Sequence, residues 1–196
     1  MQDKIRTVTV YAASSSQIDT IYFDVAKELG HLLAQHRITC INGAGNQGLM
    51  GKITDSVLEQ GGTVIGIIPR FMVVQGWCHG YLKEKIVTED MHERKKMMAD
   101  KSDACIALPG GIGTLEELLE IITWKQLGLY NCPIIILNIN NYYDDLLKML
   151  NRARKDNFMH EKHSSIWSVA KNPQQAMNII LENPQWEKDP ISIAAL

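Results

Sequence analysis

A glycine-rich turn that opens an acidic helix is the segment of this sequence best suited to chemistry. The turn runs from Pro109 to Thr114 and joins an apolar run to a helical pattern. Its glycines let backbone N–H groups crowd around an anion, and the helix dipole favours negative charge at such a start. No Gly-Lys-Ser/Thr follows, so the turn is not a Walker A loop and a triphosphate with magnesium is disfavoured. We expect a single phosphate or a phosphoribose here.

Glu117, one helical turn further on, has two interpretations. The spacing from Thr114 to Glu117 fits a capping box, in which Glu117 would bond back to the Thr114 N–H. The helical wheel instead places Glu117 away from one apolar face, on a second face that we expect to meet a cavity or another subunit. A carboxylate there would suit acid–base or cation-stabilising work. The first face holds Leu115, Leu118, Leu119 and Ile122, the second Ile121 and Trp124, and Glu116 and Glu120 are expected to be solvated.

A basic run, His92 to Lys96, lies on the helix that precedes this turn. Such runs are usually solvated charged faces. Arg94, however, shares a face with Met91, Met97 and Met98, which predicts that it is partly buried. A guanidinium suits a phosphate or a catalytic carboxylate. The run lacks the second histidine of H-E-x-x-H, so no metal site is expected.

A second glycine turn, from Gly43 to Gly48, fits G-x-G-x-x-G and makes a dinucleotide site a possible interpretation. The acid that would hold the ribose is missing, since the next strand ends Ile68-Pro69-Arg70. The turn also follows the second strand rather than the first. A tight turn that binds nothing is the other interpretation.

The elements that must position these residues alternate along the whole chain. Continuous apolar runs favour strands buried on both faces, with amphipathic helices between them. This order predicts an α/β fold with a doubly wound, mostly parallel sheet and helices on both faces, as a single domain over 1–196. The expected strands are 7–12, 38–41, 63–68, 104–108, 133–137 and 166–169, the helices 19–36, 49–60, 90–101, 114–127, 143–156 and 173–181, and 183–196 carries no readable signal.

Composition narrows the class of function. The formal net charge of −2 offers no basic surface for a nucleic acid, so we expect a small-molecule ligand. The four cysteines form no C-x-x-C pair, which favours reduced thiols in a cytoplasmic protein. No signal-peptide core or membrane-length apolar run is apparent.

Three segments together resemble the Lonely Guy family of cytokinin riboside 5′-monophosphate phosphoribohydrolases, which are often mislabelled lysine decarboxylases. They are 91–95 (M-H-E-R-K), 109–117 (P-G-G-I-G-T-L-E-E) and 122–128 (I-T-W-K-Q-L-G), and G-L-M-G at 48–51 and N-N-Y-Y-D at 140–144 add to the likeness. The resemblance runs from about Val8 to Leu181. It implies a Rossmann-like homodimer, or a higher homo-oligomer, with active sites near the interface.

The resemblance also assigns roles. It implies that Arg94 and Glu117 are the catalytic pair, and that no metal and no organic cofactor are needed. The implied substrate-binding residues are Ser14, Gly45, Met50, Lys95, Gly110, Gly111, Ile112, Gly113, Thr114, Leu115, Glu116 and Thr123.

This sequence departs from the family pattern in places. Ala12-Ala13-Ser14-Ser15 replaces the usual C-G-S-S, and Gly43-Ala44-Gly45 replaces G-G-G. Plant members carry a substrate-contacting glutamate after the third strand, where this chain has Gln75-Gly76. The loop from Phe71 to Tyr81, which contains Trp77, Cys78 and His79, is also unlike the plant form, and the sequence assigns it no role. The phosphate end is intact, and the preferred base is left open.

The leading hypothesis is hydrolysis of the N-glycosidic bond of AMP or an N6-modified AMP to the free base and ribose 5-phosphate. A non-catalytic carrier of a nucleotide or of molybdenum cofactor is the alternative from another class. A pyridoxal-phosphate lysine decarboxylase is a third, although the sequence offers no distinctive Schiff-base lysine.

Overall fold

The computed structural model describes residues 5–182, 184, 186 and 190–194. Seven strands form one sheet in the order β4-β3-β2-β1-β5-β6-β7, and every neighbouring pair is parallel. The strands are β1 (Thr7–Tyr11), β2 (Thr39–Asn42), β3 (Val64–Pro69), β4 (Glu84–Thr88), β5 (Ala104–Ala107), β6 (Ile134–Leu137) and β7 (Ser168–Ala170). The helices are α1 (Thr20–Gln35), α2 (Gly48–Glu59), α3 (Arg70–Val74), α4 (Met91–Asp100), α5 (Ile112–Gln126), α6 (Asp144–Lys155) and α7 (Pro173–Glu182), with 3-10 turns η1 (Ile139–Asn141), η2 (Glu161–Ser165) and η3 (Pro190–Ile193).

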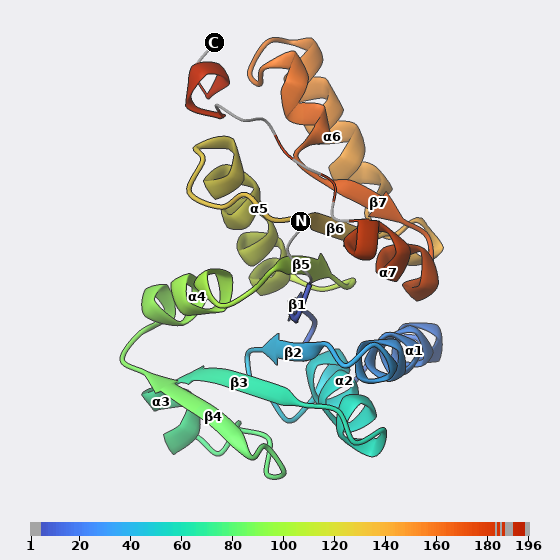
Figure 1. Ribbon diagram of the computed structural model, residues 1–196, viewed down its shortest axis with the longest axis vertical. Helices are drawn as coiled ribbons and strands as arrows, with labels where there is room; N and C mark the ends of the chain where they lie inside the picture. Colours follow the sequence, from blue (N-terminus) through green and yellow to red (C-terminus); the bar gives the residue numbers. More distant parts are fainter. Residues whose placement is uncertain (1–4, 183, 185, 187–189, 195–196) are drawn as a thin grey trace.

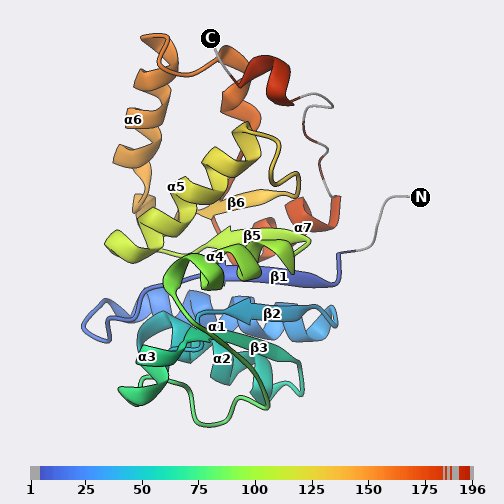
Figure 2. The ribbon, with the colours of Figure 1, turned by 90° about the vertical axis from the view of Figure 1, so that its left-hand side faces the viewer.

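Helices cover both faces of the sheet, which confirms the predicted doubly wound α/β class (Figure 1). On one face α1, α2 and α7 enclose an apolar core that includes Leu29, Ile53 and Met177. On the other face α4, α5 and α6 pack over Met98 and Leu118 (Figure 2). The inner strands are buried on both sides, since β5 and β6 expose none of their residues.

Two elements are absent from the sequence prediction. Strand β4 lies at the edge of the sheet and reads Glu-Lys-Ile-Val-Thr, with three of its five residues exposed. Edge strands carry charged side chains that keep other strands from pairing, so they lack the buried apolar pattern. Helix α3 is only five residues long and buries none of them. The tail 183–196, which carries no readable signal in the sequence, includes η3, where Ile193 is buried; residues 183, 185, 187–189 and 195–196 lie outside the described residues.

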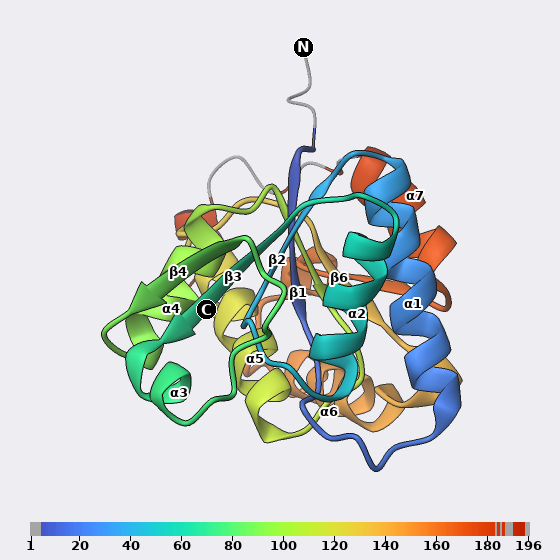
Figure 3. The same ribbon diagram turned by 90° about the horizontal axis from the view of Figure 1, so that it is seen from below.

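The position of β1 decides where a ligand can bind. The chain leaves β1 toward β2 on one side, while β5 pairs with β1 on the other. The loops that follow β1 and β5 therefore run in opposite directions and leave a crevice between them at the carboxyl edge of the sheet, as expected at a topological switch point. Both glycine turns lie at this edge, one after β2 and one after β5 (Figure 3).

Candidate active site

The crevice holds a cavity of about 390 Å³ between the loop after β1 and the start of α5. Ser14 and Ser15 line it from the first loop, and Gly111 and Gly113 line it from the second turn. Arg94 and Glu117 reach it from α4 and α5. The structure thus brings together the segments that the sequence singled out from four separate parts of the chain.

The N-terminus of α5 has no side-chain cap. The helix begins at Ile112 with Gly111 as N-cap, whereas Asp19 caps α1 and Asp90 caps α4 through their carboxylates. Thr114 is already inside the helix, so the predicted capping box between Thr114 and Glu117 is wrong. The helix starts two residues before Thr114, upstream of the residue that the motif selects as its cap. An N-terminus without a side-chain cap leaves backbone N–H groups for a ligand anion.

Two tyrosines hold the second turn from behind. The Tyr142 hydroxyl donates to the Gly110 carbonyl at 2.7 Å, and the buried Tyr143 hydroxyl donates to the Leu108 carbonyl at 2.6 Å. Carbonyls fixed in this way hold the turn and direct its N–H groups toward the crevice. The Asn-Asn-Tyr-Tyr-Asp segment therefore supports the turn from outside the cavity.

Glu117 and Arg94 form a buried ion pair. Arg94 Nη2 donates to Glu117 Oε1 at 3.2 Å, and the two side chains are 5% and 8% exposed. Burial raises the pKa of Glu117 to about 7, and the Arg94 guanidinium opposes that rise without cancelling it. A carboxyl with a pKa near neutrality at a cavity can exchange a proton at physiological pH.

Helix α5 buries parts of both faces that the helical wheel separated. Leu118 and Ile122 of the first face are buried as expected, while Leu119 is 39% exposed. Glu117 lies beside the buried Ile121 and lines the cavity, as predicted for the second face. The first turn of α5 lines the cavity at the carboxyl edge of the sheet. Further along the helix, the same buried side packs against the apolar core.

Glu116 and Glu120 are not simply solvated, as the sequence suggested. Both accept from Lys95 Nζ, Glu120 at 3.0 Å, and Lys95 is buried. The carboxylates raise the pKa of Lys95 against the effect of its burial. These pairs tie α4 to α5 beside the buried pair and so fix the spacing of Arg94 and Glu117.

Arg94 is more buried than the methionines beside it led us to predict. Its Nη1 contacts the sulfurs of Met91 at 3.5 Å and Met72 at 4.0 Å, and its Nε is buried without a hydrogen-bond partner among the described residues. The guanidinium also lies against Gly43, where an added Cβ would meet Nη2 at 1.9 Å. Glycine at position 43 is therefore what makes room for Arg94.

The first glycine turn is filled by the protein itself. The Gly45 N–H contacts the Met50 sulfur at 3.0 Å, and Gly48, with φ +61°, packs against the backbone of Ser14. Helix α2 also begins without a side-chain cap. The packing favours the structural interpretation of this turn over a dinucleotide site, because the backbone has no free approach to a pyrophosphate at Gly48.

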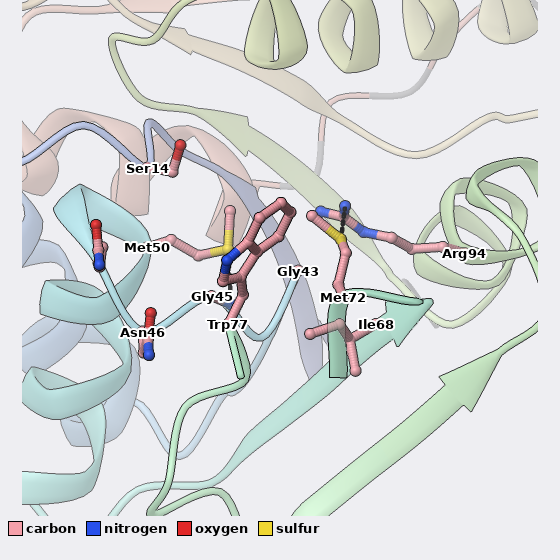
Figure 4. Close-up of a pocket in the computed structure, with 10 residues that line it drawn as sticks. Ser14, Gly43, Gly45, Asn46, Met50, Ile68, Met72, Trp77 and Arg94 are labelled. Carbon is pink, nitrogen blue, oxygen red and sulfur yellow. Dashed lines mark hydrogen bonds between the residues drawn. The ribbon is translucent and has the colours of Figure 1, made fainter. Parts of the chain in front are cut away.

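A second cavity, of about 260 Å³, adjoins the first (Figure 4). Ser14, Met50, Met72 and Arg94 line both. Trp77, from the segment that follows α3, lines the second cavity and not the first. The two cavities together form a crevice that has the uncapped start of α5 in one part and an indole in the other.

Most of the predicted site residues line this crevice, and four do not. Lys95 acts through its partners, Gly110 and Leu115 lie behind the turn, and Thr123 is exposed on α5, where its hydroxyl bonds to the Leu119 carbonyl. The lining residues are Ser14, Gly45, Met50, Arg94, Gly111, Ile112, Gly113, Thr114, Glu116 and Glu117. Sequence reasoning missed Met72 and Trp77, whose only signal was an unusual loop.

No helix among the described residues has the length and apolar character to cross a membrane. Within the same residues, no three His, Cys, Asp or Glu side chains are grouped as a metal site would require.

Fold and site define a class, a Rossmann-like α/β protein whose switch-point crevice pairs an uncapped helix start with a buried carboxylate. Comparison with known proteins gives the family. The model of a family described as "Possible lysine decarboxylase" matches residues 50–180. This chain is 40% identical over 189 residues to a probable cytokinin riboside 5′-monophosphate phosphoribohydrolase of Oryza sativa subsp. japonica, covering 96% of this chain and 78% of that protein. The chain belongs to this family, the Lonely Guy family.

Two further relatives carry the same activity in their names. A cytokinin riboside 5′-monophosphate phosphoribohydrolase of Arabidopsis thaliana is 41% identical over 178 residues, which cover 89% of this chain and 77% of that protein. One of Rhodococcoides fascians is 38% identical over 176 residues and covers 89% of both chains.

Solved structures support the fold alone. The molybdenum cofactor carrier protein of Chlamydomonas reinhardtii superposes with a TM-score of 0.70 at 20% identity, covering 91% of this chain and 98% of that one. A molybdenum cofactor binding protein of Rippkaea orientalis gives 0.66 at 23% identity, covering 92% and 96%.

Proposed function

We propose that this protein hydrolyses the N-glycosidic bond of a nucleoside 5′-monophosphate, AMP or an N6-modified AMP. One observation carries the proposal, the buried Arg94–Glu117 pair beside an uncapped helix start in one cavity. Water would add its oxygen to C1′ as the bond from C1′ to the base nitrogen breaks, and the base would leave with a proton. The products are the free base and ribose 5-phosphate.

The phosphate would bind at the second glycine turn. Backbone N–H groups of Gly111, Ile112 and Gly113 lie at the positive end of the α5 dipole. Added Cβ atoms at Gly111 and Gly113 would meet no protein atom within 4 Å, so the turn leaves space for phosphate oxygens. A phosphate fixed there places the ribose between the turn and Glu117.

Glu117 would act on the anomeric carbon. In its ionised form the carboxylate can stabilise positive charge that develops at C1′ or take a proton from the attacking water. The pKa of about 7 gives a substantial ionised fraction at neutral pH and a stronger base than an ordinary glutamate. Arg94 would hold the carboxylate in place and keep its pKa from rising further.

A comparison of AMP with adenosine tests the proposal. Charge-assisted hydrogen bonds to a phosphate are worth roughly 1.5–3 kcal/mol each, so two would favour AMP about a hundredfold or more in kcat/KM. Because remote binding energy also orients the reacting part of the substrate, kcat should fall for adenosine as well. Release of ribose 5-phosphate and adenine is measured for both compounds. Equal kcat/KM values would make the turn a structural feature, and no adenine release from any monophosphate would overturn the activity.

The carrier alternative receives support only from the fold, since the molybdenum cofactor proteins are 20–23% identical to this chain. A carrier has little need for a buried carboxylate with a pKa near 7 beside the ligand. A Schiff-base lysine has no clear candidate in the described residues, because Lys95 is held by two glutamates and Lys125 donates to the Cys132 carbonyl.

Assembly and location stay predictions. The family resemblance predicts that two copies pair near the crevice. Ile112 and Leu119, which are 82% and 39% exposed on α5, offer apolar surface beside it. A cytoplasmic location remains the expectation from composition.

A further inference from the structure

We propose that Trp77 is the base-recognition residue, stacking its indole on a planar purine, and that the segment 76–79, here called the strap, exists to hold it there. This inference rests on the proposed function and names the residue that reads the base. The sequence marked this loop as unlike plant members but assigned it no role.

The strap is fixed to the first glycine turn by backbone hydrogen bonds. The Asn46 N–H donates to the Trp77 carbonyl at 3.0 Å, and the His79 N–H donates to the Ala44 carbonyl at 2.8 Å. Between them Gly45 and Cys78 form an isolated antiparallel bridge. The Trp77 N–H also donates to the Met72 carbonyl at 3.1 Å, so the backbone is held on both sides of Trp77 and the indole position is set before any ligand arrives.

The side chain of the buried His79, at the C-terminal end of the strap, anchors the strap through two hydrogen bonds, which we call the clasp. His79 is buried, its Nδ1 accepts the Tyr81 N–H at 3.3 Å, and its Nε2 lies 3.0 Å from Asp55 Oδ1 on α2. Because Nδ1 accepts, Nε2 carries the proton and donates to the carboxylate. The clasp joins the strap to α2, the helix that the first glycine turn opens.

The side chains around the indole suit a flat aromatic ligand. Figure 4 shows the indole drawn between the Met50 and Met72 side chains, both of which line the same cavity. Trp77 is 50% exposed, although large aromatic side chains are usually buried, and it lines the cavity that adjoins the one lined by Glu117. Methionine sulfurs and an indole face both make favourable contacts with aromatic rings.

The cavity offers stacking without an acidic contact. Its lining residues include no acid, Arg94 is the charged one, and Ser14, Asn46 and Gln47 have side chains that can both donate and accept. A ribose held between the α5 turn and Glu117 would direct its base into this second cavity, since the two cavities share Arg94 and Met50. Recognition of the base would then depend mainly on the area of the ring that covers Trp77.

Ligand binding to single-substitution variants tests the inference. Dissociation constants for AMP and CMP are measured by calorimetry in the Glu117→Gln background, where turnover does not consume the ligand. Trp77→Leu should weaken AMP about ten- to hundredfold, the worth of one stacked base, and bring AMP closer to CMP. Trp77→Phe should keep most of the affinity. The inhibition constant of ribose 5-phosphate against the otherwise wild-type enzyme should stay within about twofold in both variants, because that product lacks a base.

Matched variants separate stacking from folding. Tyr81 is 80% exposed and does not line the cavity, so Tyr81→Leu should leave AMP affinity unchanged. His79→Leu should weaken AMP as Trp77→Leu does while sparing ribose 5-phosphate, and Asp55→Asn, whose amide oxygen can still accept, should retain affinity. If Trp77→Leu is folded and binds AMP as tightly as Trp77, the inference is overturned while the activity stands. If no form binds AMP or ribose 5-phosphate, both proposals fail.

Discussion

The two glycine turns look alike in sequence and differ in what surrounds them. In the first turn the missing side chains leave room for the protein itself, since a Cβ at Gly43 would strike Arg94 and one at Gly45 would strike Met50. In the second turn a Cβ at Gly110 would strike Thr114, but added Cβ atoms at Gly111 and Gly113 would meet nothing within 4 Å. The first turn shapes and supports the site, and the second leaves space for a ligand.

The carboxylate beside the second turn should show the largest effect. We expect Glu117→Gln to lower kcat for AMP about 10²- to 10⁴-fold, the usual contribution of a positioned acid or base, with little change in AMP binding. Initial rates of adenine release and calorimetric binding check both halves. Full activity in this variant would leave Glu117 with a structural role only.

A substitution in the first glycine turn should lower stability and activity by displacing Arg94. Gly43→Ala places a methyl group where the guanidinium lies, so Arg94 must move away from Glu117. We expect roughly 1–3 kcal/mol lower stability from overpacking, and a loss of activity of about tenfold or more as the ion pair is disturbed. Urea unfolding and kcat/KM measure the two effects. Gly80→Ala is the control, because a Cβ there meets nothing within 4 Å; equal behaviour of the two variants would contradict the assignment.

The ion pair should also leave a signature in stability against pH. The pKa of Glu117 is raised from an ordinary 4.5 to about 7 in the folded protein, so the folded state holds a proton that the unfolded state has lost. Wild-type stability should therefore fall as pH rises from about 4.5 to 7, by on the order of 3 kcal/mol. Gln cannot ionise, so Glu117→Gln should lack this loss and be the more stable protein at pH 8.

Unfolding in urea at pH 5 and pH 8 checks this stability prediction. Glu28→Gln, an exposed acid on α1, serves as the control. A capping role would instead give Glu117→Gln and the wild type similar stability at both pH values, because glutamine can also fill the N3 position of a capping box.

The smallest effect should come from the second turn. Gly113→Ala adds a methyl group where no protein atom lies, and alanine is the better helix former by about 1 kcal/mol. We expect unchanged or slightly higher stability together with a KM for AMP and an inhibition constant for ribose 5-phosphate that each rise about tenfold. A variant that binds both compounds like the wild type would place the phosphate elsewhere.

Local pattern predicted the features that depend on neighbours in sequence. Continuous apolar runs located six of the seven strands, because strands buried on both faces leave an unbroken signal. The edge strand β4 was missed because three of its five residues are exposed and therefore form no continuous apolar run. The glycine turn, Arg94 and Glu117 could be singled out from the sequence because charged side chains on partly apolar helix faces next to a glycine turn are typical of functional sites.

The sequence by itself determined the fold class, the position of the second glycine turn and the identity of the charged pair. The fold class follows from the alternation of apolar runs and helical patterns, and the turn and the pair from short motifs. Only the tertiary structure decided which face of α5 looks inward, and it removed the capping box by starting the helix at Ile112. It alone placed Trp77 in a cavity that adjoins the one lined by Glu117. The physical reason is that such contacts join segments distant in sequence through the crossing of helices and strands, and periodicity within one segment holds no information about them.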